Sequence, residues 1–151
     1  MEPQPDAHTL DHALRDISAR AATAVGLIGI GLIHALDAVG KYEETPYIFW
    51  MYVALILGTI VTAAVVLFTR TRLAFLAAAA LAASALVGYV LSRTTGLPSA
   101  TGDIGNWIEP LGLASMFVEA TVIGVAGAAY ALSASLQHEP LAVWRPGPQG
   151  A

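Results

Sequence analysis

Three residues with side chains capable of chemistry interrupt otherwise apolar stretches of this sequence. His34 and Asp37 are three residues apart, so they would share one face of a helix, and Glu119 is the one charged residue between Pro110 and Gln137. Imidazole and carboxylate ligands suit zinc, iron or manganese, and a carboxyl group in an apolar helix can also handle protons or small solutes. The three residues are therefore candidate ligands for a divalent metal or a proton.

A purely structural interpretation fits the same residues, because they could simply hydrogen-bond one another or nearby backbone and tie two helices together. Metal sites in helix bundles draw on Glu-x-x-His units from two helices, and the sequence contains no such unit. The absence of cysteine excludes disulfides, Cys-ligated metals and a Cys nucleophile. No GxSxG, HExxH, P-loop or GxGxxG motif is present either, so an enzyme is the weakest interpretation.

Acidic residues also gather in the segments that join the apolar stretches. Asp37, Glu43, Glu44, Asp103 and Glu109 are accompanied there only by Lys41 and Arg93. We expect Arg93 to pair with Asp103, Glu109 or Glu43, and Pro110 to occupy the first turn of the helix that follows. The candidate ligand- or proton-binding residues are thus His34, Asp37, Glu43, Glu44, Arg93, Asp103, Glu109 and Glu119.

The elements that must position these side chains are membrane helices. The chain has 151 residues, of which 56% are hydrophobic and only 12% charged, about half the usual charged share of soluble domains. Spanning helices need about 20 mostly apolar residues, and the sequence predicts four of them, at about 18–39, 46–69, 73–92 and 110–137. The fold class is therefore all-α, a four-transmembrane-helix bundle with polar tails at 1–17 and 138–151.

The distribution of basic residues predicts the orientation of this bundle. Four spans place both termini on one side, which carries five arginines, whereas the opposite loops carry only Lys41 and Arg93. Cytoplasmic loops are enriched in Lys and Arg, so both termini are expected in the cytoplasm of a multi-pass plasma-membrane protein. The net charge of −4, without a basic patch, argues against nucleic acid as a partner.

Two arrangements of the fourth helix are possible, and they place Glu119 at different depths. If Glu109 marks the outer boundary, Glu119 lies near the midplane and misses His34. If residues 120–137 make most of the crossing, Glu119 rises towards the level of His34, and we prefer this second arrangement. The seam Ala120, Gly124 and Ala128 is expected to pack within the bundle, or alternatively against a second copy or a larger membrane complex.

The stretch 92–98 (SRTTGLP), together with 109–112 (EPLG), His34 and Glu119, resembles an uncharacterised family of small four-helix bacterial integral membrane proteins. The chain departs from that family at residues 37–44, which replace an apolar-Pro-Glu-His exit. The resemblance implies a fold and an orientation but no activity. We expect a non-catalytic accessory or ligand-binding membrane protein with an acidic outward pocket, or alternatively a metal-ion or proton transporter or sensor using His34, Asp37 and Glu119.

Overall fold

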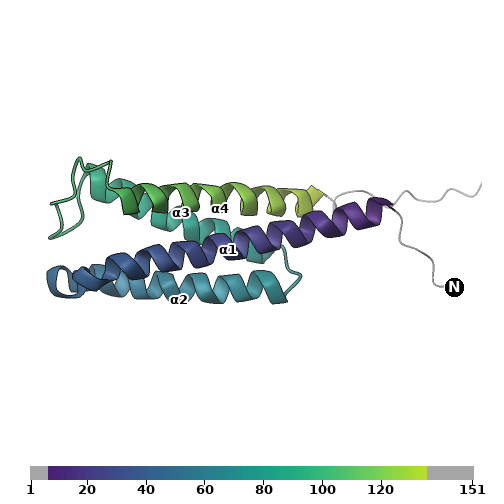
Figure 1. Ribbon diagram of the computed structural model, residues 1–151, viewed down its shortest axis with the longest axis horizontal. Helices are drawn as coiled ribbons and strands as arrows, with labels where there is room; N and C mark the ends of the chain where they lie inside the picture. The colour runs from purple at the N-terminus through teal and green to yellow at the C-terminus, as the bar shows by residue number, and fades with distance from the viewer. Residues whose placement is uncertain (1–6, 136–151) are drawn as a thin grey trace, which may run out of the picture.

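A computed structural model describes residues 7–135 as four antiparallel helices joined by short connections (Figure 1). Each helix is long and apolar enough to cross a membrane, which confirms the all-α, four-helix prediction. The predicted tail at 138–151 lies outside the described residues. The helices are α1 (Ala7–Glu44), α2 (Pro46–Phe68), α3 (Leu73–Thr94) and α4 (Pro110–Ser135).

The first helix is longer than predicted at both ends. It begins at Ala7 rather than near residue 18, because residues 7–17 contain no Gly or Pro and gain the i,i+4 ion pair Arg15–Asp11, with an N–O distance of 2.9 Å. Its 38 residues span roughly 57 Å, well beyond a hydrocarbon core of about 30 Å. The helix therefore extends past the rest of the bundle at the end where α4 finishes (Figure 1).

Prolines and a short connection fix the start of two helices. Thr45 alone joins α1 to α2, and its N–H donates to the carbonyl of Lys41 over 2.9 Å. Pro46 and Pro110 open α2 and α4, where a missing N–H costs nothing. We call the end of the bundle that carries Thr45 and residues 95–109 the loop end, and the opposite end, with residues 69–72, the turn end.

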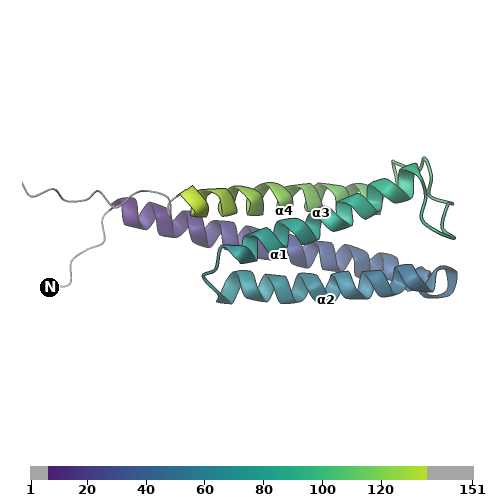
Figure 2. The same ribbon diagram turned by 180° about the vertical axis from the view of Figure 1, so that it is seen from behind.

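Helix α1 packs against both α2 and α4, with α3 lying mainly on α4 (Figures 1 and 2). Two glycines of α1 permit this close approach. A Cβ added at Gly26 would collide with the Val122 side chain of α4, and one added at Gly31 would lie 2.7 Å from Thr59 Oγ1 of α2. The buried core runs along these contacts and includes Leu27, Ile30, Phe75 and Val122.

Arginine 20 holds the turn end together. Its guanidinium donates to the carbonyls of Val66 and Thr69 over 2.8 and 2.6 Å, so it satisfies acceptors left free where α2 ends. The same group pairs with Asp16 at 2.7 Å and lies 5.2 Å from the centre of the Phe75 ring. One side chain of α1 therefore joins the ends of α2 and α3.

The prediction that the Ala120/Gly124/Ala128 seam of α4 packs within the bundle is wrong. All three residues are exposed, and no side chain lies within 4 Å of a Cβ built on Gly124. The buried face instead carries Ser115 and Glu119 together with apolar side chains. Burial of a carboxyl group decides this rotation, because lipid offers it no hydrogen bonds and the interior of the bundle does.

Candidate functional site

A cavity of about 630 Å³ opens at the loop end and is lined by residues of all four helices and of the 95–109 loop. This volume falls within the range of small-molecule sites, roughly 300–1,000 Å³. The part of the cavity nearest the 95–109 loop is polar, and the part that lies farther towards the turn end, between α2 and α3, is apolar. The titratable side chains that line it are His34, Asp37, Lys41, Tyr52, Tyr89, Arg93, Asp103 and Glu109.

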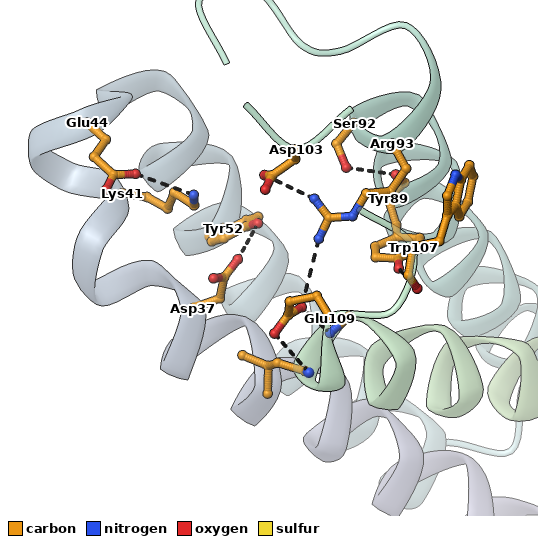
Figure 3. A network of polar contacts seen from close by, with 12 residues as sticks. Asp37, Lys41, Glu44, Tyr52, Tyr89, Ser92, Arg93, Asp103, Trp107 and Glu109 are labelled. Carbon is orange, nitrogen blue, oxygen red and sulfur yellow. Dashed lines mark hydrogen bonds and ion pairs between the residues drawn. The ribbon is translucent and has the colours of Figure 1, made fainter. Parts of the chain in front are cut away.

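Arginine 93, in the last turn of α3, is the centre of the polar part (Figure 3). Its side chain is only 8% exposed and pairs with Asp103 at 3.0 Å and with Glu109 at 3.8 Å. The guanidinium also lies 4.9 Å from the centre of the Tyr89 ring. Of the three acids expected to pair with Arg93, two do so, and Glu43 does not.

The Glu109 carboxylate also caps α4. Its two oxygens accept hydrogen bonds from the N–H groups of Leu111 and Gly112, over 3.0 and 2.6 Å. A negative charge is favourable at a helix N-terminus, where N–H groups have no helical partner. Glu109 therefore links the start of α4 to Arg93 and so to the end of α3.

The 95–109 loop is held over the cavity by tight backbone turns. Gly96 and Gly105 have φ of +76° and +81°, a region that favours glycine, and the N–H of Gly105 donates to the Arg93 carbonyl over 2.9 Å. Tyr47 at the start of α2 donates its hydroxyl to the Pro98 carbonyl over 2.6 Å. The loop is thereby attached to both α3 and α2.

Asp37 faces α2 rather than α4. Its carboxylate accepts a hydrogen bond from the Tyr52 hydroxyl over 2.7 Å (Figure 3). The Tyr52 ring packs edge-on against His34, with ring centres 5.0 Å apart. Sequence reasoning missed Tyr52 and Tyr89 as site residues, because aromatic residues near helix ends equally suit a membrane interface. The sequence positions of Tyr52 and Tyr89 fit both locations equally, so no signal in the sequence assigned them to the cavity.

His34 and Glu119 do approach each other, because α1 continues to Glu44 and places His34 as far from the loop end as Glu119 lies along α4, which begins at Pro110. The depth of Glu119 in the membrane, on which the two arrangements of α4 differ, stays a prediction. His34 Nε2 lies 3.9 Å from Glu119 Oε1, and the Ser115 hydroxyl donates to the same oxygen over 2.7 Å. His34 Nδ1 lies 2.9 Å from the Ile30 carbonyl, which requires its proton on Nδ1 and leaves Nε2 facing Glu119. Glu119 is fully buried, and among residues 7–135 its Oε2 has no hydrogen-bond partner.

The other candidate residues are not brought into this arrangement. Glu43 is exposed, and Glu44, also exposed, pairs with Lys41 at 3.5 Å on the rim of the cavity. Since Asp37 contacts Tyr52 and Glu119 contacts Ser115, the proposed ligands His34, Asp37 and Glu119 do not converge. Within the described range 7–135, no group of three or more His, Cys, Asp or Glu side chains could hold a metal ion.

No family model, curated protein or solved structure matches this chain. The resemblance of residues 92–98 and 109–112 to small four-helix bacterial membrane proteins therefore stays a prediction. Any function has to be argued from the cavity and its side chains.

Arg93→Met should lower the free energy of unfolding by about 1–3 kcal/mol, because it leaves Asp103 and Glu109 without their cation. The loss stays moderate because water still reaches the partly exposed Asp103 carboxylate. Arg70→Met, which removes an exposed arginine at the turn end, is the matched control and should change it by less than about 0.5 kcal/mol. Reversible denaturation in detergent measures both values. Equal losses in the two variants would contradict the role given to Arg93.

Proposed function

We propose that this chain is a non-catalytic, multi-pass protein of the plasma membrane that binds a small ligand in the loop-end cavity. The observation that carries the proposal is a cavity of about 630 Å³ whose polar groups come from four helices and an ordered loop. Arg93, Asp103 and Glu109 hold that loop in place, so the cavity is built before any ligand arrives. A preorganised site of this kind reduces the ordering cost of binding.

We further propose that the protein is an accessory component of a larger membrane assembly, or that it forms a homo-oligomer. The exposed Ala120/Gly124/Ala128 seam supports it, since small residues allow another membrane helix to approach closely. A partner or a second copy should co-purify after mild detergent extraction. Recovery from native membranes only as a single chain would contradict this part of the proposal.

Both termini are proposed to lie in the cytoplasm, which makes the cavity face outwards. The excess of arginines at the turn end supports this orientation. Because the chain has no cysteine, Gly102→Cys at the loop end and Thr71→Cys at the turn end each introduce a single exposed thiol. A membrane-impermeant maleimide added to intact cells should label Gly102→Cys and leave Thr71→Cys unlabelled until the cells are lysed. The reverse pattern would invert the orientation.

Occupancy of the cavity can be tested with one pair of glycine variants. Gly88 lines the cavity, and a Cβ added there meets no atom within 4 Å, so the larger side chain of Gly88→Leu should project into the cavity and occupy part of its volume. Gly127→Leu in α4 is the matched control, since Gly127 is equally open but does not line the cavity.

Native mass spectrometry of protein taken directly from membranes should show an added mass on the wild type and on Gly127→Leu. The affinity should fall by at least about tenfold in Gly88→Leu, equivalent to about 1.4 kcal/mol of lost binding, and the bound fraction should fall with it. A wild-type protein without any added mass, or equal occupancy in both variants, would reject the proposal.

A second candidate function is binding of a proton by a transporter or sensor that uses His34 and Glu119, since Asp37 pairs with Tyr52 and the three side chains do not converge on a metal. The observation that favours the proton is the buried Glu119 carboxyl group, with one unpartnered oxygen in the described chain, beside His34. In liposomes containing a pH-sensitive dye, the wild type should then pass protons down an imposed gradient faster than Glu119→Gln. Equal rates would reject proton transport.

A further inference from the structure

The cavity has a polar end and an apolar end that differ in their surroundings. At the polar end, side chains of Asp37, Tyr52, Arg93 and Asp103 face inwards beneath the loop (Figure 3). The apolar end lies between α2 and α3, which pack against each other less extensively than α1 packs against α2 or α3 against α4. Its lining is Met51, Ala54 and Leu55 of α2 with Leu81, Ala85 and Gly88 of α3.

The apolar end opens sideways, between α2 and α3. The two helices meet near the turn end and diverge towards the loop end (Figure 2). Gly58 and Leu81 close the opening on the side of the turn end, since a Cβ added at Gly58 would lie 3.4 Å from Leu81 Cδ1. The Tyr47–Pro98 hydrogen bond closes it on the side of the loop end.

Lining residues within this opening are exposed at a depth where the surroundings are lipid. Met51 is 58% exposed, and Ala54 and Ser84 are exposed as well. Tyr47 and Gly58 are eleven positions apart, a rise of roughly 16 Å along α2, about half of a hydrocarbon core of about 30 Å. The opening therefore faces the acyl chains of a single leaflet, and an apolar chain can pass through it without crossing water.

The charges at the polar end select the head group. Arg93 already serves two carboxylates, and Lys41 pairs with Glu44. Asp37 receives only the Tyr52 hydroxyl among the hydrogen bonds of the described residues, so this carboxylate can accept further donors. Three carboxylates and two cations line the cavity, and this excess of negative charge disfavours a phosphate or carboxylate head.

We propose that the ligand is a single-chain amphipath with a non-anionic head that donates hydrogen bonds, such as a hydroxyl or an ammonium group. It enters from the bilayer between α2 and α3, places its head near Asp37 and leaves its chain against Met51 and Gly88. The proposal rests on the function proposed above, because it requires the loop-end cavity to be a ligand site.

Three photoreactive probes test the proposal on the protein in nanodiscs. All three carry the same long alkyl chain with a diazirine at its middle, and they differ only in the head group, which is an alcohol, an ammonium or a carboxylate. Peptide mapping should place the alcohol and ammonium adducts on the α2 and α3 residues that line the cavity. Labelling there should fall at least about tenfold in Gly88→Leu and stay unchanged in Gly127→Leu. Asp37→Asn should weaken labelling by the ammonium probe more than labelling by the alcohol.

The mapping in wild-type protein keeps the test decisive even if Gly88→Leu does not fold. Adducts spread over the outer faces of all four helices, or equal cavity labelling by the carboxylate probe, would overturn the proposal. If native mass spectrometry finds a bound molecule without an alkyl chain, this inference fails and the ligand-binding function stands. If the cavity binds neither a native molecule nor any probe, both fail.

Discussion

The ion pairs of Arg93 are the interaction on which the loop end depends. Asp103 belongs to the 95–109 loop, Glu109 caps α4, and Arg93 itself lies in the last turn of α3, so one guanidinium fixes three segments. Its side chain is almost completely buried, and a buried cation that lost its acids would carry a heavy desolvation cost. The loop consequently has little freedom to move without the ends of both helices, and the cavity below it keeps its shape.

The membrane explains why the polar side chains collect where they do. The helices carry apolar side chains on their outer faces as well as inside, and Val25 and Phe117 are among the many large ones left exposed. Polar groups can then be satisfied only at helix ends or towards the interior of the bundle. The cavity lies both at helix ends and in the interior of the bundle, and it joins a polar part beneath the 95–109 loop to an apolar gap between α2 and α3.

Much of the fold could be predicted from the sequence, because stretches without charge mark membrane helices and prolines mark their first turns. The pairing of Arg93 with Asp103 and Glu109 followed from the scarcity of cations nearby. The rotation of α4 could not be predicted from its small residues, since a helix that is apolar on every side has no periodicity to orient it. One buried carboxyl group, Glu119, decides that rotation.

The cavity itself was beyond sequence reasoning for a related reason. Its volume arises where α3 diverges from α2, with α2 packed mainly on α1 and α3 mainly on α4. Tyr52 and Tyr89 belong to the site only because of that geometry, although each is an ordinary interfacial residue by sequence. Glu43 shows the opposite error, since its position among acids suggested a site residue and its side chain is exposed outside the cavity.

A high-resolution cryo-electron microscopy map of the protein in nanodiscs made from its native lipids would show what the cavity holds. We expect elongated density between α2 and α3 that ends in a head group within hydrogen-bonding distance of Asp37, beneath a loop fixed by Arg93. A map in which α3 packs along the whole length of α2, with no space between Met51 and Gly88, would contradict this expectation.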